Sequence, residues 1–309
     1  MEASITFKKV SQLLDGKTVL SGLSFGIERN STVAIIGDND DSGLTEFLRI
    51  IAGMNDPNYG SLYIHGFDSI KRRSNIRKLI GYVPFKNDMD PWLTAEQNIN
   101  FINSFYNLDN KKLKENYKNY IESLDLSSKM NVEVNKLSPG ALKKLTLLRE
   151  LSRDPKVLVL DNPTAFMNAK DIALTWDVLQ ALKNKLTMIY SSTSLDTIEN
   201  NHDRILVFHD GKIDLDDNLD SMLKNWMGHY QFTIQFEKIL TSLYHKIEKV
   251  QNIISPIQKD NTLTFNGDDR SVLLRVMTLL VGVTILDINI KRFHLRDLLE
   301  ARYMQEGVV

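Results

Sequence analysis

The turn that follows the apolar run at residues 32–36 is the part of this sequence best placed for phosphate chemistry. It reads Gly37-Asp38-Asn39-Asp40-Asp41-Ser42-Gly43-Leu44-Thr45, and a helical apolar pattern follows it. A phosphate-binding loop would read G-x-x-x-x-G-K-[ST] between a strand and a helix. In one register, Ser42 replaces the second glycine, Gly43 the lysine and Leu44 the magnesium-binding hydroxyl. In the register shifted by one residue, Gly43 and Thr45 fit, and Leu44 replaces the lysine.

Neither register supplies the positive charge that a phosphate requires, and the loop carries Asp38, Asp40 and Asp41 instead. A carboxylate about 6 Å from a phosphate costs roughly 3 kcal/mol per pair of unit charges at an effective dielectric near 20. We therefore expect no nucleotide at this loop. Three interpretations of the loop remain open: an exposed Asp/Asn turn without a ligand, a site for a cation or a partner's basic group, and weak nucleotide binding through backbone amides.

Alternating strands and helices must position this loop, and they indicate an α/β fold with a parallel sheet. Short apolar runs predict strands at residues 4–10, 20–27, 32–36, 157–160 and 187–190. Phe47, Leu48, Ile50 and Ile51 recur at helical spacing, and Gly53 closes that helix. A helix is also expected at residues 171–183, and a polar, helix-rich stretch at residues 93–134.

The character of the chain changes near residues 225–228, after which a smaller α+β domain is expected. Residues 230–236 alternate apolar and polar side chains, which is typical of an antiparallel strand. A helix, two short strands, a helix at 270–280, a strand at 284–290 and a helix at 295–303 follow. The sequence therefore predicts two domains, residues 1–225 and 228–309, with a helical subdomain at about residues 86–136.

Composition excludes several classes of protein. The 309 residues carry 38 Lys+Arg against 39 Asp+Glu, so bulk positive charge cannot drive nucleic-acid binding. The chain has no cysteine, which removes disulfides, zinc-thiolate sites and cysteine nucleophiles. Its six histidines show no metal-ligand spacing, so no metal site is expected. The most apolar stretch, residues 272–288, contains Arg275 and Asp287 and is shorter than the ~20 residues that span a bilayer.

Five further segments occur in a fixed order along the chain. They are Gly81-Tyr82-Val83-Pro84-Phe85, Leu137-Ser138-Pro139-Gly140-Ala141, Val157-Leu158-Val159-Leu160-Asp161-Asn162-Pro163-Thr164, Ser191-Ser192-Thr193-Ser194-Leu195-Asp196 and Leu295-Arg296-Asp297-Leu298-Leu299. With the loop at 37–45, they resemble the motifs of ABC transporter ATP-binding subunits. The resemblance covers residues 1 to about 220, and the tail resembles the extra domain of the ABC-2 exporter subfamily. It implies a P-loop NTPase-like fold with a β-subdomain, a RecA-like parallel sheet and a helical subdomain.

The departures from these motifs are as systematic as the matches. Six positions that carry the family's chemistry have a different residue in this chain. The phosphate lysine is replaced by Gly43, the Q-loop glutamine by Phe85, the catalytic glutamate by Asn162, the switch histidine by Thr193, the D-loop aspartate by Asn168 and the adenine-stacking aromatic by Leu14. Only Asp161 of Walker B and two signature residues, Ser138 and Gly140, match the family. Because Asn162 cannot accept a proton from water, no catalytic residue is expected and the chain is expected not to hydrolyse ATP.

The signature segment, residues 137–141, could still contact ATP that is bound by a partner subunit. In this family two nucleotide subunits stack head to tail, so Ser138 and Gly140 could reach the γ-phosphate of ATP on a partner. Pro139 removes one amide donor, whereas Lys143 and Lys144 are expected to leave the surface positive. The alternative is that residues 137–140 form a helix start that is kept for packing.

A second feature could serve an interface. Phe85, Met89 and Trp92 are expected to form either an exposed apolar patch facing a membrane subunit or part of the core of the helical subdomain.

The leading hypothesis is a non-hydrolysing subunit of an ABC-2-like exporter, with no cofactor at its own site. ATP and magnesium are expected only at a composite site with a partner. The expected partners are transmembrane subunits and a second, different nucleotide-binding subunit, but no nucleic acid. Its expected place is the cytoplasmic face of the membrane, held there by those partners. Two alternatives are a divergent but active transporter ATPase and a soluble regulatory protein on the same scaffold.

Overall fold

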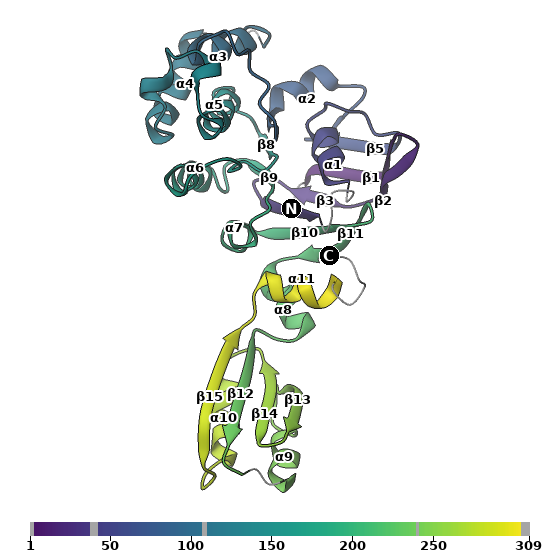
Figure 1. Ribbon diagram of the computed structural model, residues 1–309. Helices are drawn as coiled ribbons and strands as arrows, with labels where there is room; N and C mark the ends of the chain where they lie inside the picture. Colours follow the sequence, from purple (N-terminus) through teal and green to yellow (C-terminus); the bar gives the residue numbers. More distant parts are fainter. Residues whose placement is uncertain (1–2, 38–42, 107–109, 239–240, 304–309) are drawn as a thin grey trace. The chain divides into compact units, whose positions relative to one another are not determined.

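The computed structural model describes residues 3–37, 43–106, 110–238 and 241–303 (Figure 1). The chain divides into two compact units, Met1–Asp216 and Asp217–Val309. The helix α8 (Leu219–Trp226) lies in the second unit, where it contacts α11 (Leu295–Tyr303). The division therefore falls before α8, whereas the expected boundary at residues 225–228 falls at its end.

The first unit contains an antiparallel sheet built around one long strand. Its strands pair in the order β2-β1-β5-β6, and β3 also pairs with β1. The bounds are β1 (Ala3–Leu14), β2 (Lys17–Leu23), β3 (Gly26–Glu28), β5 (Tyr59–Ile64) and β6 (Phe67–Asp68). The single strand expected at residues 20–27 is thus wrong, because Ser24 and Phe25 separate two strands. In this break the Phe25 ring stacks on Phe7 of β1, at 4.6 Å between centroids.

The second sheet of this unit is mainly parallel, as expected. Its strand order is β11-β10-β4-β9-β8-β7, and the four pairs from β10 to β7 are parallel. The bounds are β4 (Thr32–Gly37), β7 (Ile80–Val83), β8 (Val157–Leu160), β9 (Thr187–Ser191), β10 (Arg204–His209) and β11 (Lys212–Asp217). All four residues of β8 are buried, which is typical of a strand covered on both faces.

Helices cover these sheets and form a cluster of their own (Figure 1). Their bounds are α1 (Leu44–Ile51), α2 (Arg73–Leu79), α3 (Ala95–Ser104), α4 (Asn110–Ser123), α5 (Pro139–Leu151), α6 (Ala169–Ala181) and α7 (Leu195–Asn200), with short 3-10 turns at Ser127–Lys129 and Val134–Lys136. Phe47 of α1 packs between Phe7 and Phe208, with centroids 5.2 and 4.8 Å away. The apolar face of α1 therefore lies in the core between the two sheets and holds the end of β4 in place.

The second unit has one antiparallel sheet with strand order β13-β14-β12-β15. The bounds are β12 (Tyr230–Phe236), α9 (Thr241–Ile247), β13 (Ile254–Lys259), β14 (Thr262–Gly267), α10 (Ser271–Leu279) and β15 (Ile285–Arg292). Phe232, Ile234 and Phe265 lie in the core that this sheet forms with α9 and α10. Among the helices of the described ranges, none has both the length and the apolar character needed to cross a membrane.

Candidate functional site

The start of α1 decides which register of the phosphate loop applies. Gly43 precedes α1 with φ +77°, a conformation that L side chains rarely adopt. A Cβ atom added at Gly43 would lie 2.0 Å from the carbonyl oxygen of Val19, so no other residue fits. A helix start preceded by an obligatory glycine matches the second glycine of the motif. The structure therefore favours the shifted register, in which Leu44 replaces the lysine and Thr45 occupies the hydroxyl position.

The described part of the loop provides no cation for a phosphate. Leu44 is half-buried and packs against the core, whereas Thr45 is exposed. Gly37 ends β4 at the other side of the loop. The five remaining predicted loop residues, Asp38, Asn39, Asp40, Asp41 and Ser42, lie outside the described residues.

Asp161, the predicted Walker B residue, lies directly after β8 and is buried. The Ser191 hydroxyl at the end of β9 donates to Asp161 Oδ1 at 3.1 Å and accepts from the Asn162 amide at 3.0 Å. Burial raises the pKa of the Asp161 carboxyl, and the Ser191 hydrogen bond partly opposes this shift. The ends of two neighbouring parallel strands thus bring Asp161, Asn162 and Ser191 together, as their places in the sequence indicate.

The two positions expected to carry a base do not do so. Asn162 has φ +47°, a left-handed conformation that asparagine tolerates better than glutamate. Thr193 lies exposed in the loop between β9 and α7. An amide and a hydroxyl cannot take a proton from water at neutral pH. The chain therefore offers no general base at either position.

Phe85, at the predicted Q-loop position, makes this side of the site apolar. Its ring lies 5.4 Å from that of Phe166. The two rings border a hollow of about 220 Å³ that is also lined by Pro139, Leu142 and Lys143. An aromatic ring has no oxygen to offer a metal ion, so this position cannot act as the glutamine would.

Lys143 and Lys144 correct the sequence-based expectation of a positive surface. Both lie on α5, and only 5% and 1% of these two residues, respectively, is exposed. Lys143 Nζ donates to the carbonyl oxygens of Phe85 at 3.1 Å and Asp161 at 2.9 Å, and to that of Pro84. Burial lowers the pKa of Lys143 to about 8. Lys144 forms an ion pair with Asp171 at 2.5 Å.

The signature segment forms the start of α5. Ser138 is the N-cap, and its hydroxyl oxygen accepts from the Ala141 amide at 3.2 Å. Pro139 occupies the first turn, where its missing amide proton costs nothing. A Cβ atom added at Gly140 would lie 3.0 Å from the Phe166 carbonyl oxygen, so this glycine permits close packing. Leu137 is half-buried and Ala141 buried, so only the Ser138–Pro139 step is exposed.

Two other predicted positions have local structural roles or none. Asn168 caps α6, because its side-chain oxygen accepts from the Asp171 amide at 2.9 Å. Leu14 is the last residue of β1 and about half exposed. Among the residues that the structure describes, no group of three or more His, Cys, Asp or Glu side chains could hold a metal ion.

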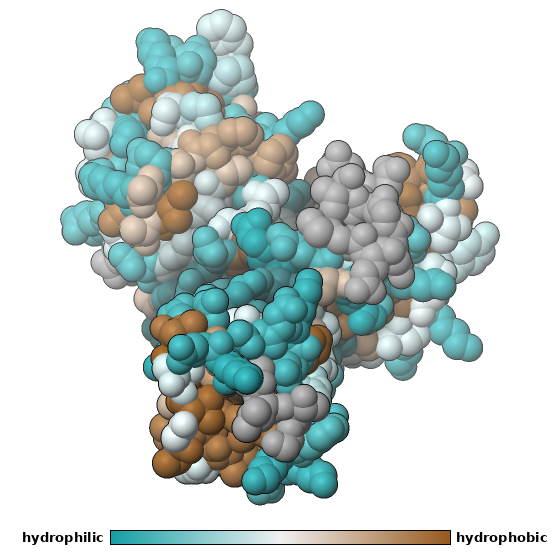
Figure 2. All heavy atoms as spheres, turned by 60° about the horizontal axis from the view of Figure 1, so that its bottom comes forward, coloured by the Kyte–Doolittle hydropathy of each residue, from teal (hydrophilic) through white to brown (hydrophobic). Residues whose placement is uncertain are grey.

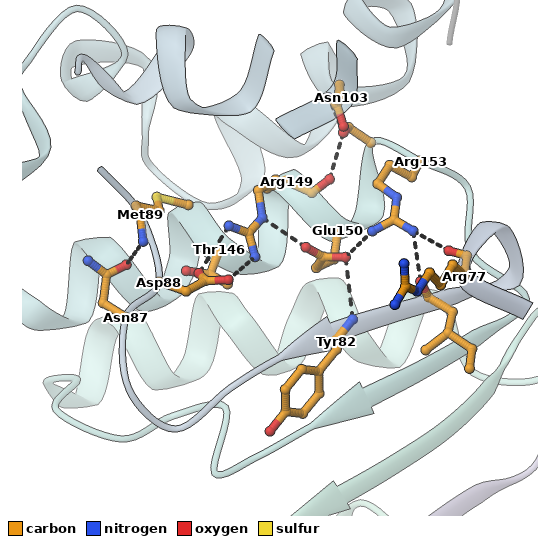
Figure 3. A network of polar contacts seen from close by, with 12 residues as sticks. Arg77, Tyr82, Asn87, Asp88, Met89, Asn103, Thr146, Arg149, Glu150 and Arg153 are labelled. Carbon is orange, nitrogen blue, oxygen red and sulfur yellow. Dashed lines mark hydrogen bonds and ion pairs between the residues drawn. The ribbon is translucent and has the colours of Figure 1, made fainter. Parts of the chain in front are cut away.

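Sequence reasoning missed an ion-pair network beside the site, in which the Arg149, Glu150 and Arg153 side chains are buried and that of Asp88 is half-exposed (Figure 3). Arg149 of α5 makes two hydrogen bonds to Asp88, at 3.0 and 2.9 Å, and donates to Glu150 at 2.8 Å. Glu150 also accepts from Arg153 at 2.6 Å and from the Tyr82 amide at 3.3 Å. The network attaches β7 and the segment after it to α5. The adjacent arginine and glutamate on one helix were the only signal of it in the sequence.

The apolar residues of the same segment separate in the structure. Met89 is buried, whereas Phe85 and Trp92 are exposed. Of the two alternatives, burial therefore holds for Met89, whereas exposure holds for Phe85 and Trp92.

Magnesium-ATP does not fit the described residues of this site. The phosphate position has Leu44 instead of a cation, and the ammonium of Lys143 already bonds three backbone carbonyls. Asp161 is the only acidic group of the family's catalytic set that is present. A phosphate here would lack both charge compensation and a base.

Comparisons with known proteins bear on the family and the fold of the chain. A family model described as ABC transporter matches residues 20–165. The chain is 30% identical over 210 residues to the Nod factor export ATP-binding protein I of Rhizobium etli, covering 68% of this chain and 66% of that protein. It is 30% identical over 213 residues to the protein of the same name from Paraburkholderia xenovorans, covering 68% and 69%. The matched part spans about two thirds of the length of these relatives.

Solved structures share the fold. A structure described as an ATP-binding subunit of an ABC transporter has a TM-score of 0.67 at 20% identity, covering 72% of this chain and 92% of its own. A nucleotide-free ATP-binding cassette from an ABC transporter has a TM-score of 0.63 at 20% identity, covering 72% and 94%. At these identities the likeness concerns the fold alone.

Proposed function

The chain belongs to the family of ABC transporter ATP-binding proteins, and from this we propose that it is a non-hydrolysing subunit of an export complex. Its relatives are named as export proteins, which supports export as the direction of transport. In this role the chain binds transmembrane subunits at the cytoplasmic face of the membrane. It passes conformational changes between them and a second nucleotide-binding subunit, which is a different chain with intact motifs.

The observation that carries the proposal is the start of α1. Gly43 cannot bear a side chain, and the residue after it, where the lysine belongs, is Leu44 packed on the core. A lysine at position 43 would therefore disrupt this helix start, and at position 44 the chain has an apolar side chain in place of a cation. The site also lacks a general base. Asn162, in a left-handed conformation, and the exposed Thr193 occupy the two positions where the family carries one.

The exposed helix start at Ser138 supports a composite site with the partner. Its hydroxyl oxygen caps the helix, which leaves the hydroxyl proton available to donate to a phosphate. Gly140 is buried, so the exposed Ser138 is the group that can meet a phosphate at this end of α5, where the helix dipole favours an anion. ATP with magnesium, bound by the partner's own loop, is the ligand that this end of α5 suits.

Calorimetric titration of the purified chain with magnesium-ATP tests the first half of the proposal. The wild-type chain is expected to show no saturable binding up to millimolar nucleotide. Leu44→Lys restores the phosphate cation at the position that the structure favours, and Leu44→Met is its matched uncharged control. Saturable binding of magnesium-ATP by the wild-type chain, with higher affinity in Asp40→Ala, would contradict the proposal. It would support the divergent-ATPase hypothesis instead.

Co-purification in detergent tests the second half. Expressed with the membrane proteins of its host, the tagged chain is expected to retain a membrane protein and a second ATP-binding subunit. ATP hydrolysis by that complex is expected to be abolished by mutation of the partner's phosphate loop alone. A chain that purifies without any membrane protein would support the soluble regulatory alternative.

A further inference from the structure

The two edges of the sheet in the second unit differ in how they are protected. The β13 edge contains Pro256, which has no amide proton, and Ser255 has φ +47°. The pairing of β13 with β14 shifts register between Ile254 and Ile257. Such features block the addition of another strand. The β15 edge is regular from Asp287 to Arg292 and contains no proline.

The open β15 edge also exposes large apolar side chains. Leu286, Ile288 and Ile290 are 60%, 37% and 41% exposed. Ile288 and Ile290 pair with Ile234 and Phe232 of β12, both buried, so they lie on the helix-covered face of the sheet.

The neighbouring helix and the turn after it expose apolar side chains as well. Leu274 of α10 and Val281 in the turn after it are also exposed. Figure 2 shows hydrophobic side chains gathered at the end of this unit, where a turn connects α10 to β15. An eight-residue edge strand of this kind is a template for pairing with another strand.

The residues of β15 are complementary to themselves. In an antiparallel pair of two β15 strands centred on Asn289, Ile288 of each copy faces Ile290 of the other. Asp287 of each copy faces Lys291 of the other, on the opposite face of the sheet. Opposite charges that face each other across strands stabilise a pair, and like charges destabilise it. Few registers of an eight-residue strand satisfy both its apolar and its charged positions at once.

We propose that the β15 edge binds the β15 edge of a second copy of this chain, in the antiparallel register centred on Asn289. The two four-stranded sheets then form one continuous sheet of eight strands. Ile288 and Ile290 become covered by their counterparts, while Lys291 lies between Asp297 of its own chain, at 2.5 Å, and Asp287 of the other copy. Asp287 makes no ion pair with any residue that the structure describes. The proposal concerns the second unit alone and does not depend on the proposed function.

Cysteine cross-linking of the full-length chain tests both the contact and its register. The chain has no cysteine, so each introduced thiol is the only one present. At the centre of an antiparallel pair, the Cα atoms of facing residues are ~4.5–5.5 Å apart, within disulfide range. Under mild oxidation, Asn289→Cys is expected to form a covalent dimer. Gln258→Cys, on the blocked β13 edge, is the matched control and is expected to stay monomeric.

A mixture of two cysteine variants tests which residues face each other across the two strands. Asp287→Cys and Lys291→Cys are expected to cross-link with each other but not with themselves, because only unlike positions face each other. Equal cross-linking of Asn289→Cys and Gln258→Cys, or self-linking of Asp287→Cys as fast as the mixture, would overturn the proposal.

Analytical ultracentrifugation gives a measurement without a new thiol. The wild-type chain is expected to show a monomer–dimer equilibrium in the ~1–100 µM range, as a small interface allows. Asp287→Lys places like charges opposite each other twice and is expected to weaken dimerisation about tenfold. Mixing Asp287→Lys with Lys291→Glu restores opposite charges and is expected to restore the dimer. A monomeric wild-type chain throughout this range would overturn the proposal.

Discussion

The side-chain nitrogen of Lys143 lies 2.9 Å from the backbone carbonyl oxygen of Asp161, with both residues buried in the first unit. Two more hydrogen bonds join the same nitrogen to the carbonyls of Pro84 and Phe85. One ammonium group thus connects α5, the end of β8 and the segment after β7. The cation lies near the degenerate site, but its three protons are used by the backbone, so it cannot replace the missing phosphate lysine.

The depressed pKa of Lys143 makes stability depend on pH. The pKa is about 8 in the folded chain against an ordinary value of 10.5, so between these values the unfolded chain binds more protons. The free energy of unfolding therefore rises with pH across this window. Relative to Lys143→Met, the wild-type chain is expected to gain about 1.5 kcal/mol from pH 8 to 9.5. Urea unfolding of both proteins measures this, and a pH-independent difference would contradict it.

Tyr82 does not disturb that comparison. Burial raises the pKa of Tyr82 to about 12, which makes stability fall above pH 10, but both proteins keep this tyrosine. The difference between them reports Lys143 alone.

The close packing of Gly43 predicts a strong effect of a small substitution. Gly43→Ala brings a Cβ atom into the Val19 carbonyl at a positive φ, and is expected to lower the free energy of unfolding by about 3 kcal/mol or more. Gly53→Ala is the matched control, because Gly53 also has a positive φ but open space around it. Its expected cost is about 1 kcal/mol. Equal losses in chemical denaturation would show that Gly43 is not sterically required.

Glu150 is the centre of the network shown in Figure 3, and its removal is expected to destabilise the fold. Glu150→Gln leaves two guanidinium groups without their buried carboxylate and is expected to cost about 3 kcal/mol. Asp88→Asn removes the half-exposed carboxylate of the same network and is expected to cost about 1 kcal/mol or less. The two free energies of unfolding, measured side by side, decide whether burial sets the cost.

Two substitutions of Ser138 separate its role as the N-cap of α5 from its proposed contact with a phosphate. Ser138→Asp keeps an N-cap acceptor and is expected to leave the free energy of unfolding nearly unchanged, whereas Ser138→Ala is expected to lose about 1 kcal/mol. A carboxylate facing a γ-phosphate is expected to lower ATP hydrolysis of the assembled complex at least about tenfold. Hydrolysis that is unchanged by Ser138→Asp would show that α5 begins there for packing alone.

Local patterns were sufficient for much of the fold. The parallel strands β4, β8 and β9 are mainly apolar runs, and the order of strands, helices and motifs along the chain predicts an α/β sheet. The loss of the catalytic groups at Asn162, Thr193 and Phe85 was also visible, because a residue type limits chemistry wherever it lies. The break between β2 and β3 was missed, since the packing of Phe25 on Phe7 joins residues far apart in sequence.

By itself, then, the sequence determined the class of fold, the family and the missing chemistry, all of which depend on residue type and spacing. Tertiary structure alone decided the register of the phosphate loop, through the Val19 carbonyl against Gly43. It likewise decided that Lys143 is buried on backbone carbonyls and that the β15 edge is open while β13 is blocked. These features depend on atoms brought together by long-range packing, where burial and the nearest partner, not the residue type, set charge, pKa and exposure.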